Sequence, residues 1–337
     1  MNTGDLRAER NKKVKDYYRG KKVLVTGGAG FLGSHLAEFL VEDGANVSVV
    51  DNLERGSKEN LCSVMKNIEF IEADLRDFES AKRAMKGKDV VINMAAKVTG
   101  IHYNRLHHGD MFTQNLMILT NSLEAARLCD VKRFTVVSTA CIYPHDAKVP
   151  TPESEGLRGT PEPTNEGYGW SKRMGEVQGM YFAKEYGMEI AIVRPFNAYG
   201  CRDYFDEATS HVIPALIKKI LDGMNPVPIW GSGKQSRVFV HGKDFARGIE
   251  LVTAFHPKAD PVNIGHDKEI TIRNLFAKLC ELLKKNPEPF YDTSMPEGYP
   301  RRAADTTKLK QVTMGWEPEV SLEEGLREMI EWYLRRK

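Results

Sequence analysis

The chain has 337 residues, of which 41% are hydrophobic and 28% charged, and its formal net charge is +2. This near-neutral balance excludes a strongly basic nucleic-acid binder, and no apolar run is long enough to cross a bilayer. Five cysteines, scattered and without a CxxC pair, predict neither a zinc site nor a disulfide framework, so we expect no metal and a cytoplasmic location.

Apolar strand-like segments alternate with helical segments through the first part of the chain. We expect strands at 22–26, 46–50, 68–72, 90–94, 134–138 and 189–194, and helices at 34–42, 116–128, 168–186, 210–221, 272–284 and 321–334. This alternation predicts an α/β fold, a Rossmann-type doubly wound parallel sheet with a smaller C-terminal α/β substrate lobe. The expected division is an N-terminal extension at 1–20, an NAD-binding domain at 21–195 to which later strands return, and a mainly substrate-binding lobe at 196–337.

The first expected strand runs directly into a glycine-rich turn with the pattern GxxGxxG. Gly27 would permit a tight turn, Gly30 a close approach of the backbone to a pyrophosphate, and Gly33 close packing of a helix on the strand. Phe31 and Leu32 lie at the start of that helix, where unpaired N–H groups and the helix dipole favour an anion. A glycine pattern between a strand and a helix indicates a dinucleotide site.

Acidic and small residues follow the next three strands. Asp51, with Asn52 beside it, lies about 20 residues beyond the glycine turn, where a carboxylate accepts hydrogen bonds from the ribose hydroxyls of NAD. Arg55 and Lys58 follow closely and could instead serve the extra phosphate of NADP, so both cofactors stay open. Further cofactor contacts are expected near the adenine at Asp74 and Leu75, and near the nicotinamide ribose at Ala95, Ala96 and Lys97.

A tyrosine and a lysine, Tyr168 and Lys172, lie four residues apart, which places them on one face of a helix. A phenol with a pKa of about 10 is a poor acid–base catalyst at neutral pH. A neighbouring ammonium stabilises the phenolate, and it can also hold the ribose hydroxyls. Downstream of Thr139 and behind a dinucleotide fold, the YxxxK pattern predicts the pair that moves hydride and proton at a sugar carbon.

Several longer motifs point to a known family. They are Ala95-Ala96-Lys97-Val98, Cys141-Ile142-Tyr143-Pro144, Glu162-Pro163-Thr164-Asn165-Glu166, Ser210-His211-Val212-Ile213-Pro214-Ala215 and Trp230-Gly231-Ser232-Gly233. With them the chain resembles, almost from end to end, the extended short-chain dehydrogenase/reductase family of NAD-dependent epimerases and dehydratases. Within that family the motifs are most similar to those of GDP-fucose synthases and GDP-mannose 3,5-epimerases.

The resemblance implies a role for each matching residue. Thr139 would hydrogen-bond the sugar O4 beside Tyr168, Cys141 would remove a proton next to a ketone, and His211 would return one on the other face. Cys141 as a small core residue and His211 as a core or capping histidine are the structural alternatives. Substrate contacts are expected at Asn197, Val212, Trp230, Arg237 and Arg301, the last three in the region that holds a diphosphate.

The resemblance further implies an NAD-dependent nucleotide-sugar epimerase, with a GDP-linked hexose as the favoured substrate. Oxidation of C4 to a ketone acidifies the C3 and C5 protons, so that Cys141 and His211 can invert a centre before the hydride returns. Three alternatives stay open: a GDP-4-keto-6-deoxy-sugar 3,5-epimerase/4-reductase that uses NADPH, a UDP-sugar 4-epimerase, and a catalytically silent NAD-binding scaffold. Ala140-Cys141, in place of an acidic pair, argues against a 4,6-dehydratase. The family also implies a homodimer formed through a four-helix contact.

Overall fold

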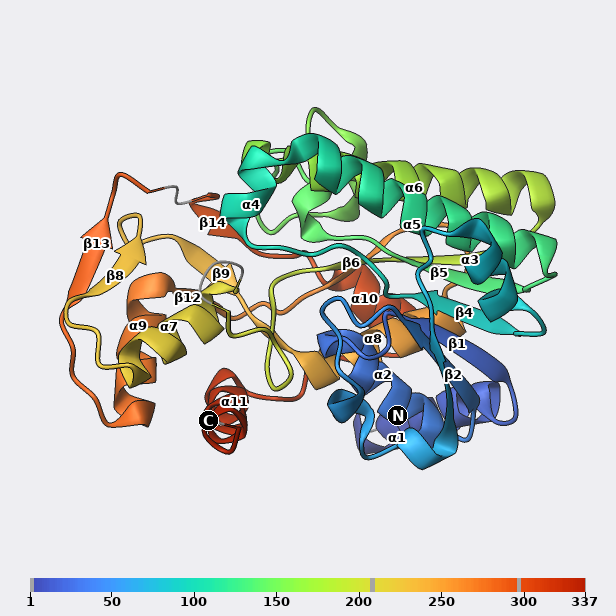
Figure 1. Cartoon of the computed structure of the whole chain (residues 1–337), viewed down its shortest axis with the longest axis horizontal. Coiled ribbons are helices and arrows are strands. Elements are labelled where there is room, and N and C mark those ends of the chain that lie inside the picture. The colour runs from blue at the N-terminus through green and yellow to red at the C-terminus, as the bar shows by residue number, and fades with distance from the viewer. Residues whose placement is uncertain (1–2, 207–209, 296–297, 337) are drawn as a thin grey trace.

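The computed structural model describes residues 3–206, 210–295 and 298–336. Its centre is a parallel sheet of seven strands in the order β11-β6-β5-β4-β1-β2-β3 (Figure 1). The strands are β1 (Lys22–Thr26), β2 (Asn46–Asp51), β3 (Ile68–Glu72), β4 (Val90–Asn93), β5 (Arg133–Val137), β6 (Glu189–Pro195) and β11 (Val262–Ile264). The predicted Rossmann-type fold is confirmed.

Helices cover both faces of this sheet. Strand β1 shows why, because Val23 and Val25 face one core while Leu24 faces the other, and all three are fully buried. One face carries α1 (Thr3–Tyr18), α2 (Phe31–Glu42) and α8 (Gly242–Phe255), and the opposite face carries α3 (Phe78–Met85), α5 (His108–Leu128) and α6 (Glu166–Tyr186).

The helix α1 packs against α8. Its Val14 and Tyr18 side chains are fully buried in the core of that face, and the Tyr18 hydroxyl donates to the Glu250 carbonyl at 2.9 Å. The segment that the sequence analysis set apart as an extension therefore contributes apolar side chains to the sheet's own core.

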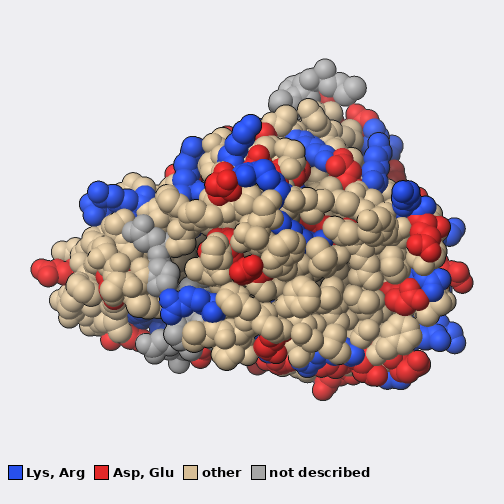
Figure 2. Space-filling view, turned by 90° about the horizontal axis from the view of Figure 1, so that it is seen from above, with Lys and Arg blue, Asp and Glu red and all other residues tan. Residues whose placement is uncertain are grey.

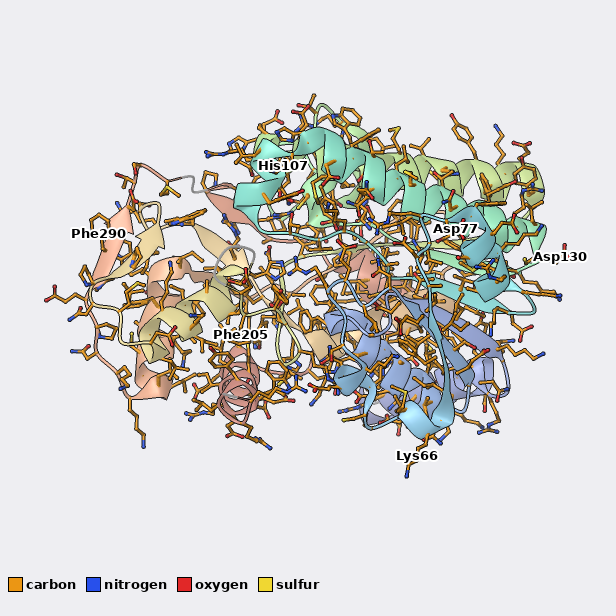
Figure 3. The ribbon with its side chains drawn as sticks, in the orientation of Figure 1. Lys66, Asp77, His107, Asp130, Phe205 and Phe290 are labelled. Atoms are coloured by element: carbon orange, nitrogen blue, oxygen red, sulfur yellow. The ribbon has the colours of Figure 1, made fainter. Side chains whose placement is uncertain are left out.

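A second lobe lies beyond the carboxyl ends of the strands (Figure 1). Three helices and two strands enclose its core, which includes Ile217, Leu275 and Met329. Phe290 marks the outer edge of the lobe, whereas the Phe205 ring stacks on Tyr333 with centroids 4.1 Å apart (Figure 3). These five elements are α7 (Val212–Leu221), α9 (Ile272–Leu283), α11 (Leu322–Leu334), β8 (Val227–Trp230) and β13 (Pro289–Asp292).

Short elements connect the two parts. A three-stranded sheet combines β9 (Ser236–Val238), β12 (Glu269–Thr271) and β14 (Arg301–Arg302), and β7 (Ala198–Tyr199) pairs with β10 (Val240–His241). The remaining helices are α4 (Ile101–Leu106), α10 (Thr307–Val312) and the 3-10 turns η1 (Lys58–Leu61), η2 (Met65–Asn67), η3 (Ala140–Ile142), η4 (Glu153–Leu157) and η5 (Pro163–Asn165).

Most helix boundaries lie within a few residues of those expected, which is the usual uncertainty of helix ends. The largest difference is α5, which begins at His108 rather than at residue 116. The helix α7 begins at Val212, so that His211 precedes it as the N-cap residue without a capping side-chain bond. No helix among the described residues is long and apolar enough to span a membrane.

Candidate active site

The glycine turn between β1 and α2 has the geometry that a dinucleotide requires. Gly27 has a φ of +63°, and a Cβ there would lie 2.8 Å from the Cα of Ala95 on the neighbouring strand end. A Cβ on Gly33 would collide with the Gly27 carbonyl oxygen. Gly30 is the N-cap residue of α2, so the first N–H groups of that helix point out of its end, as a pyrophosphate needs. These residues fit a dinucleotide.

Replacing Gly33 with alanine is expected to weaken NAD binding by at least about tenfold, because the new methyl group pushes α2 away from the turn that holds the pyrophosphate. Titration of the purified protein with NAD, followed by calorimetry, measures the loss. Gly109→Ala is the matched control, since a Cβ there meets nothing within 4 Å. Unchanged affinity in Gly33→Ala would contradict a pyrophosphate site at this turn.

Asp51, the expected ribose acid, lies buried at the end of β2. Its Oδ2 accepts from the Ala29 N–H at 3.0 Å and its Oδ1 from the Leu53 N–H at 2.8 Å. Burial raises the pKa of this carboxyl, and the two backbone bonds act against that increase. The two backbone donors hold the carboxylate beside the glycine turn, where it could accept from a ribose.

The two basic side chains considered for NADP both have other partners. Lys58 Nζ pairs with Glu72 at 2.9 Å. The Arg55 guanidinium lies 4.3 Å from the centroid of the Tyr204 ring and donates to the Val98 carbonyl. Among the described residues, both side chains that could bind the 2′-phosphate of NADP are therefore engaged with other groups.

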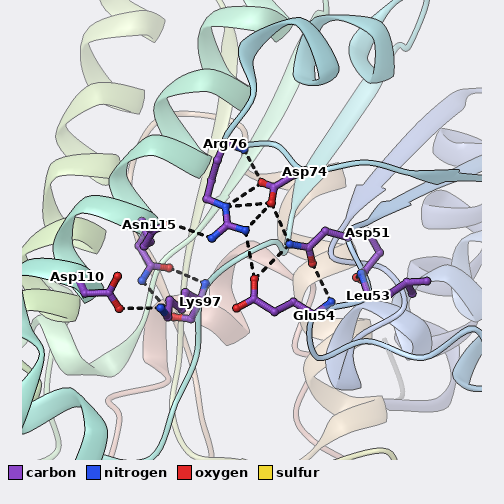
Figure 4. Close-up of polar contacts among 10 residues, drawn as sticks. Asp51, Leu53, Glu54, Asp74, Arg76, Lys97, Asp110 and Asn115 are labelled. Carbon is purple, nitrogen blue, oxygen red and sulfur yellow. Dashed lines mark hydrogen bonds and ion pairs between the residues drawn. The ribbon is translucent and has the colours of Figure 1, made fainter.

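A polar network surrounds Asp74 at the end of β3 (Figure 4). Arg76 donates from Nε to both carboxylate oxygens at 2.9 and 3.0 Å, and Asn52 donates to Oδ2 at 3.2 Å. The hydrogen bonds from Arg76 lower the pKa of Asp74 to about 2, whereas partial burial acts to raise it. Arg76 also reaches Glu54 and Gln114, and so ties the expected adenine end of the site to α5.

A second polar group holds the segment after β4. The Lys97 N–H donates to Asn115 Oδ1 at 2.9 Å, and Lys97 Nζ pairs with Asp110 at 2.6 Å (Figure 4). The Ala95 N–H donates to Thr26 Oγ1 at 3.0 Å. Sequence reasoning found Lys97 and Ala95 but missed Asp110 and Asn115, because they lie on α5, whose first turns carried no clear helical signal.

Thr139, Cys141 and Tyr168 lie next to one another. Thr139 caps η3, where its Oγ1 accepts from the Cys141 N–H at 3.2 Å, and it also hydrogen-bonds the Tyr168 phenol. Burial raises the pKa of that phenol and the nearby Cys141 adds to the increase, whereas the Thr139 hydrogen bond lowers it. The predicted catalytic hydroxyl, thiol and phenol are therefore neighbours.

Lys172 lies one turn along α6 from Tyr168, as the spacing predicted. Its Nζ is 5.6 Å from the centroid of the Tyr168 ring and donates to the Val137 carbonyl at 2.9 Å. Burial lowers the pKa of Lys172 to about 8, against the opposing charge of Glu176. The expected acidification of the phenol by this ammonium is therefore not found: burial raises the pKa of Tyr168, and the group that lowers it is Thr139.

An ion pair between Glu176 and Arg194 fixes α6 against β6. Arg194 donates to the two Glu176 oxygens at 2.9 and 2.7 Å, and the two side chains are 0% and 2% exposed. Arg194 also donates to the Tyr143 hydroxyl at 3.0 Å and to the Glu153 carbonyl at 2.7 Å. The pair lies one helical turn beyond Lys172 and holds the face of α6 that carries Tyr168 and Lys172.

His211 lies apart from this pocket, in the second lobe. Its Nδ1 is 3.2 Å from both carboxylate oxygens of Asp203, which is buried, while the imidazole is 48% exposed. The Asp203 charge raises the pKa of His211, and burial and Arg55 act in the opposite direction. Sequence reasoning missed Asp203, because an acidic residue in an irregular segment carries no periodic signal.

Replacing Asp203 with asparagine is expected to lower the pH at which His211 titrates, because the carboxylate that favours the imidazolium is removed. If His211 returns a proton as an acid, activity requires the protonated ring, and the alkaline limb of the activity profile moves to lower pH. Proton NMR of the His211 ring across a pH series measures the shift directly, with His211→Gln to assign the signal. An unchanged titration would show that Asp203 does not set the protonation of His211.

The expected substrate contacts have mixed surroundings. Asn197 follows β6 with a φ of +35° and donates to the Val238 carbonyl at 2.9 Å. Val212 and Trp230 are half-buried at the start of α7 and the end of β8. The Arg237 guanidinium donates to the Ser236 and Tyr299 carbonyls, and exposed Arg301 forks onto Glu269 at 2.6 to 2.9 Å. Their roles toward a substrate stay predictions.

The fold and the pocket together define a dinucleotide-binding enzyme with a tyrosine–lysine pair. A sequence model of the NAD dependent epimerase/dehydratase family matches residues 23–265. The chain belongs to this family, which confirms the resemblance stated from the motifs and makes the protein an NAD(P)-dependent enzyme of that group.

Individual relatives agree with this family. The chain is 33% identical to a probable GDP-L-fucose synthase 1 of Oryza sativa subsp. japonica, over 94% of this chain and 93% of the relative. It is 32% identical to the GDP-L-fucose synthase of Escherichia coli strain K12, over 94% and 98%. A crystal structure of UDP-glucose 4-epimerase from Thermotoga maritima with UDP-glucose is 32% identical and matches with a TM-score of 0.83, over 94% and 99%.

Proposed function

We propose that this chain is an NAD-dependent epimerase of nucleotide sugars, acting on a GDP-linked hexose through transient oxidation at C4 and proton exchange at C3, C5 or both. The observation that carries the proposal is the contact of Tyr168 with both Thr139 and Cys141. Oxidation and reduction at C4 require, besides bound NAD, only a phenol that takes and returns the O4 proton. A thiol beside it adds a base for a neighbouring carbon acid.

The first step takes place at C4 of the sugar. Tyr168 accepts the O4 proton while Thr139 hydrogen-bonds the same oxygen, and bound NAD supplies the chemistry of accepting and later returning a hydride. Lys172, held by the Val137 carbonyl, would orient the nicotinamide ribose through its hydroxyls. Because burial raises the pKa of the phenol, Tyr168 retains the proton that it takes from O4 until the proton is returned to the sugar.

The second step takes place at the carbon beside the ketone. Cys141, as thiolate, takes the proton from C3 or C5, and the electron pair of the broken C–H bond forms an enolate with oxygen at C4. His211, charged through its bond to Asp203, gives a proton to the opposite face of the same carbon. The centre is then inverted, and reduction of the ketone needs no added reductant. Cys141 releases its proton to water and His211 takes one up, which completes the cycle.

The surroundings of Asp51 support NAD over NADP. The carboxylate is buried at the ribose end, and both basic side chains that could bind a 2′-phosphate have partners elsewhere. The 2′-phosphate of NADP would lie close to the Asp51 carboxylate at that position, and the two negative groups would repel each other. The preference for GDP rests on the two GDP-L-fucose synthase relatives, which share about the same identity with this chain as the UDP-glucose 4-epimerase does.

Two other activities are kept as candidates because a specific observation favours each. The relatives named as GDP-L-fucose synthases favour an epimerase/reductase that consumes NADPH on a 4-keto-6-deoxy sugar. The solved UDP-glucose 4-epimerase favours inversion of C4 itself. The intact catalytic cluster argues against a silent scaffold.

Incubation in deuterium oxide with one nucleotide sugar at a time separates these activities. The substrates are GDP-mannose, its 4-keto-6-deoxy form and UDP-glucose, each with and without NADPH, and the products are read by NMR and mass spectrometry. Deuterium at C3 or C5 of GDP-mannose without reductant supports the proposal. Deuterium together with stoichiometric NADPH consumption on the keto sugar supports the reductase, and C4 inversion of UDP-glucose without deuterium supports the 4-epimerase.

We also propose a homodimer that forms through α5 and α6. Seen from above, the middle of the face that these helices form carries few charged side chains (Figure 2). Its exposed apolar side chains include Met117, Leu128 and Tyr181. Such a patch on a monomer indicates a protein contact. Sedimentation of the purified protein tests the assembly, and a monomer at micromolar concentration would contradict it.

A further inference from the structure

Two neighbouring arginines on β14 face different surroundings. Successive side chains of a strand point to opposite sides. Arg301 is exposed and forks onto Glu269, whereas Arg302 is half-buried and its Nη2 lies 3.4 Å from the Sγ of Cys141. The contact joins β14 to η3, the turn that follows β5, across 161 residues of sequence.

An aromatic ring holds the Arg302 guanidinium in place. Its Cζ lies 5.1 Å from the centroid of the Tyr299 ring, a cation–π contact. The Tyr299 hydroxyl donates to the Tyr143 carbonyl at 2.8 Å. The His145 ring stacks on the Tyr299 ring with centroids 5.3 Å apart. The guanidinium is therefore directed at the sulfur by a fixed support rather than by a flexible stem alone.

We propose that Arg302 is the positioning residue for Cys141: the Arg302 guanidinium donates an N–H to the sulfur and favours the thiolate that acts as the base. This inference rests on the proposed function, because it gives the proton exchange at C3 or C5 its active thiolate. A cation in contact with a cysteine stabilises the anion and so increases the fraction that can react at neutral pH.

The charged groups around this contact differ in sign. Arg302 is the cation that contacts the sulfur, and its charge is favoured by both Cys141 and Tyr299. The phenol of Tyr168 competes with the thiolate, because two anions side by side repel each other. The other titratable groups facing Arg302 or Tyr299 are Glu162, Arg173 and the stacked ring of His145.

The contact between Arg302 and Cys141 also bears on which reaction the site can perform. Cys141 follows β5 and Arg302 lies on β14, so the cation reaches the sulfur only because these two distant segments meet. The same contact separates carbon-acid chemistry from simple inversion of C4, which needs the phenol but no thiolate.

The test measures the reactivity of the thiol without any substrate. Iodoacetamide reacts with the thiolate, and mass spectrometry of the Cys141 peptide gives the alkylation rate at each pH for the full-length protein. In Arg302→Met we expect the half-maximal rate at higher pH than in the wild type, and an alkylation rate at pH 7 that is lower by about tenfold. Arg302→Lys should restore much of the rate, because it keeps the positive charge.

Arg301→Met is the matched control, since it removes an adjacent cation from the same strand without touching the sulfur. Its alkylation profile should equal that of the wild type. Identical profiles in wild type and Arg302→Met would overturn the proposal, and so would an equal shift in Arg301→Met. If Arg302→Met fails to fold by circular dichroism, Arg302→Gln, which keeps polar donors but no charge, serves with the same criteria.

This readout is independent of the proposed reaction. If no nucleotide sugar gains deuterium in the wild type while Arg302→Met still slows alkylation, the proposed epimerase fails and the contact between arginine and thiolate stands. If deuterium enters the sugar at the same rate in Arg302→Met and in the wild type, and alkylation is also unchanged, the role of Arg302 fails and the epimerase stands.

Discussion

Replacing Tyr168 with phenylalanine is expected to lower kcat by about 10²- to 10⁴-fold, because it removes the group that takes and returns the O4 proton. The fold should be unaffected, since the ring stays in place and only the hydrogen bond to Thr139 is lost. NAD affinity should change little, because the glycine turn and Asp51 remain.

Turnover of the nucleotide sugar identified by the deuterium experiment measures this loss, and NAD titration measures retained binding. Tyr186→Phe is the matched control, because that phenol lies at the far end of the same helix, is 45% exposed and should be dispensable. Wild-type turnover in Tyr168→Phe would mean that hydride transfer at C4 does not depend on this phenol, and the mechanism proposed for the pocket would be wrong.

Replacing Glu176 with alanine is expected to lower the free energy of unfolding by about 3–5 kcal/mol, because it leaves the Arg194 guanidinium buried without its counter-charge. The hydrogen bonds of Arg194 to Tyr143 and Glu153 remain but cannot neutralise the charge. The pKa of Lys172 should also fall further, since the Glu176 charge raises it.

Urea unfolding monitored by circular dichroism gives the change in free energy. Glu331→Ala is the matched control, because its pair with Arg335 is exposed on both sides and should contribute about 0–1 kcal/mol. Equal, small losses in the two variants would show that the Arg194 charge is accommodated without Glu176, and that the pair does not anchor α6.

Local patterns in the sequence were sufficient for the sheet and for the core of the site. Strand and helix periods are fixed by backbone geometry, so alternating segments predicted the parallel sheet, which the structure confirms. The turn from Gly27 to Gly33 needs its glycines for steric reasons that act within a few residues. The spacing of Tyr168 and Lys172 depends only on the pitch of one helix.

Contacts between segments far apart in the chain could not be predicted from local sequence patterns. The packing of Tyr18 on α8, the bond from Asp203 to His211 and the turn of Arg302 rather than Arg301 toward Cys141 depend on how separate elements meet. The raised pKa of Tyr168 was also beyond sequence reasoning, because the phenol is buried only once distant segments pack together.

The sequence by itself determined the fold class and the places of the glycine turn and the YxxxK pattern, because each is encoded by residues close together in the chain. Only the tertiary structure decided which charges support those residues, since side-chain direction and removal from water arise from packing across the sheet and the second lobe. Glu176 with Arg194, and Arg302 with Cys141, are the two pairs that only this packing reveals.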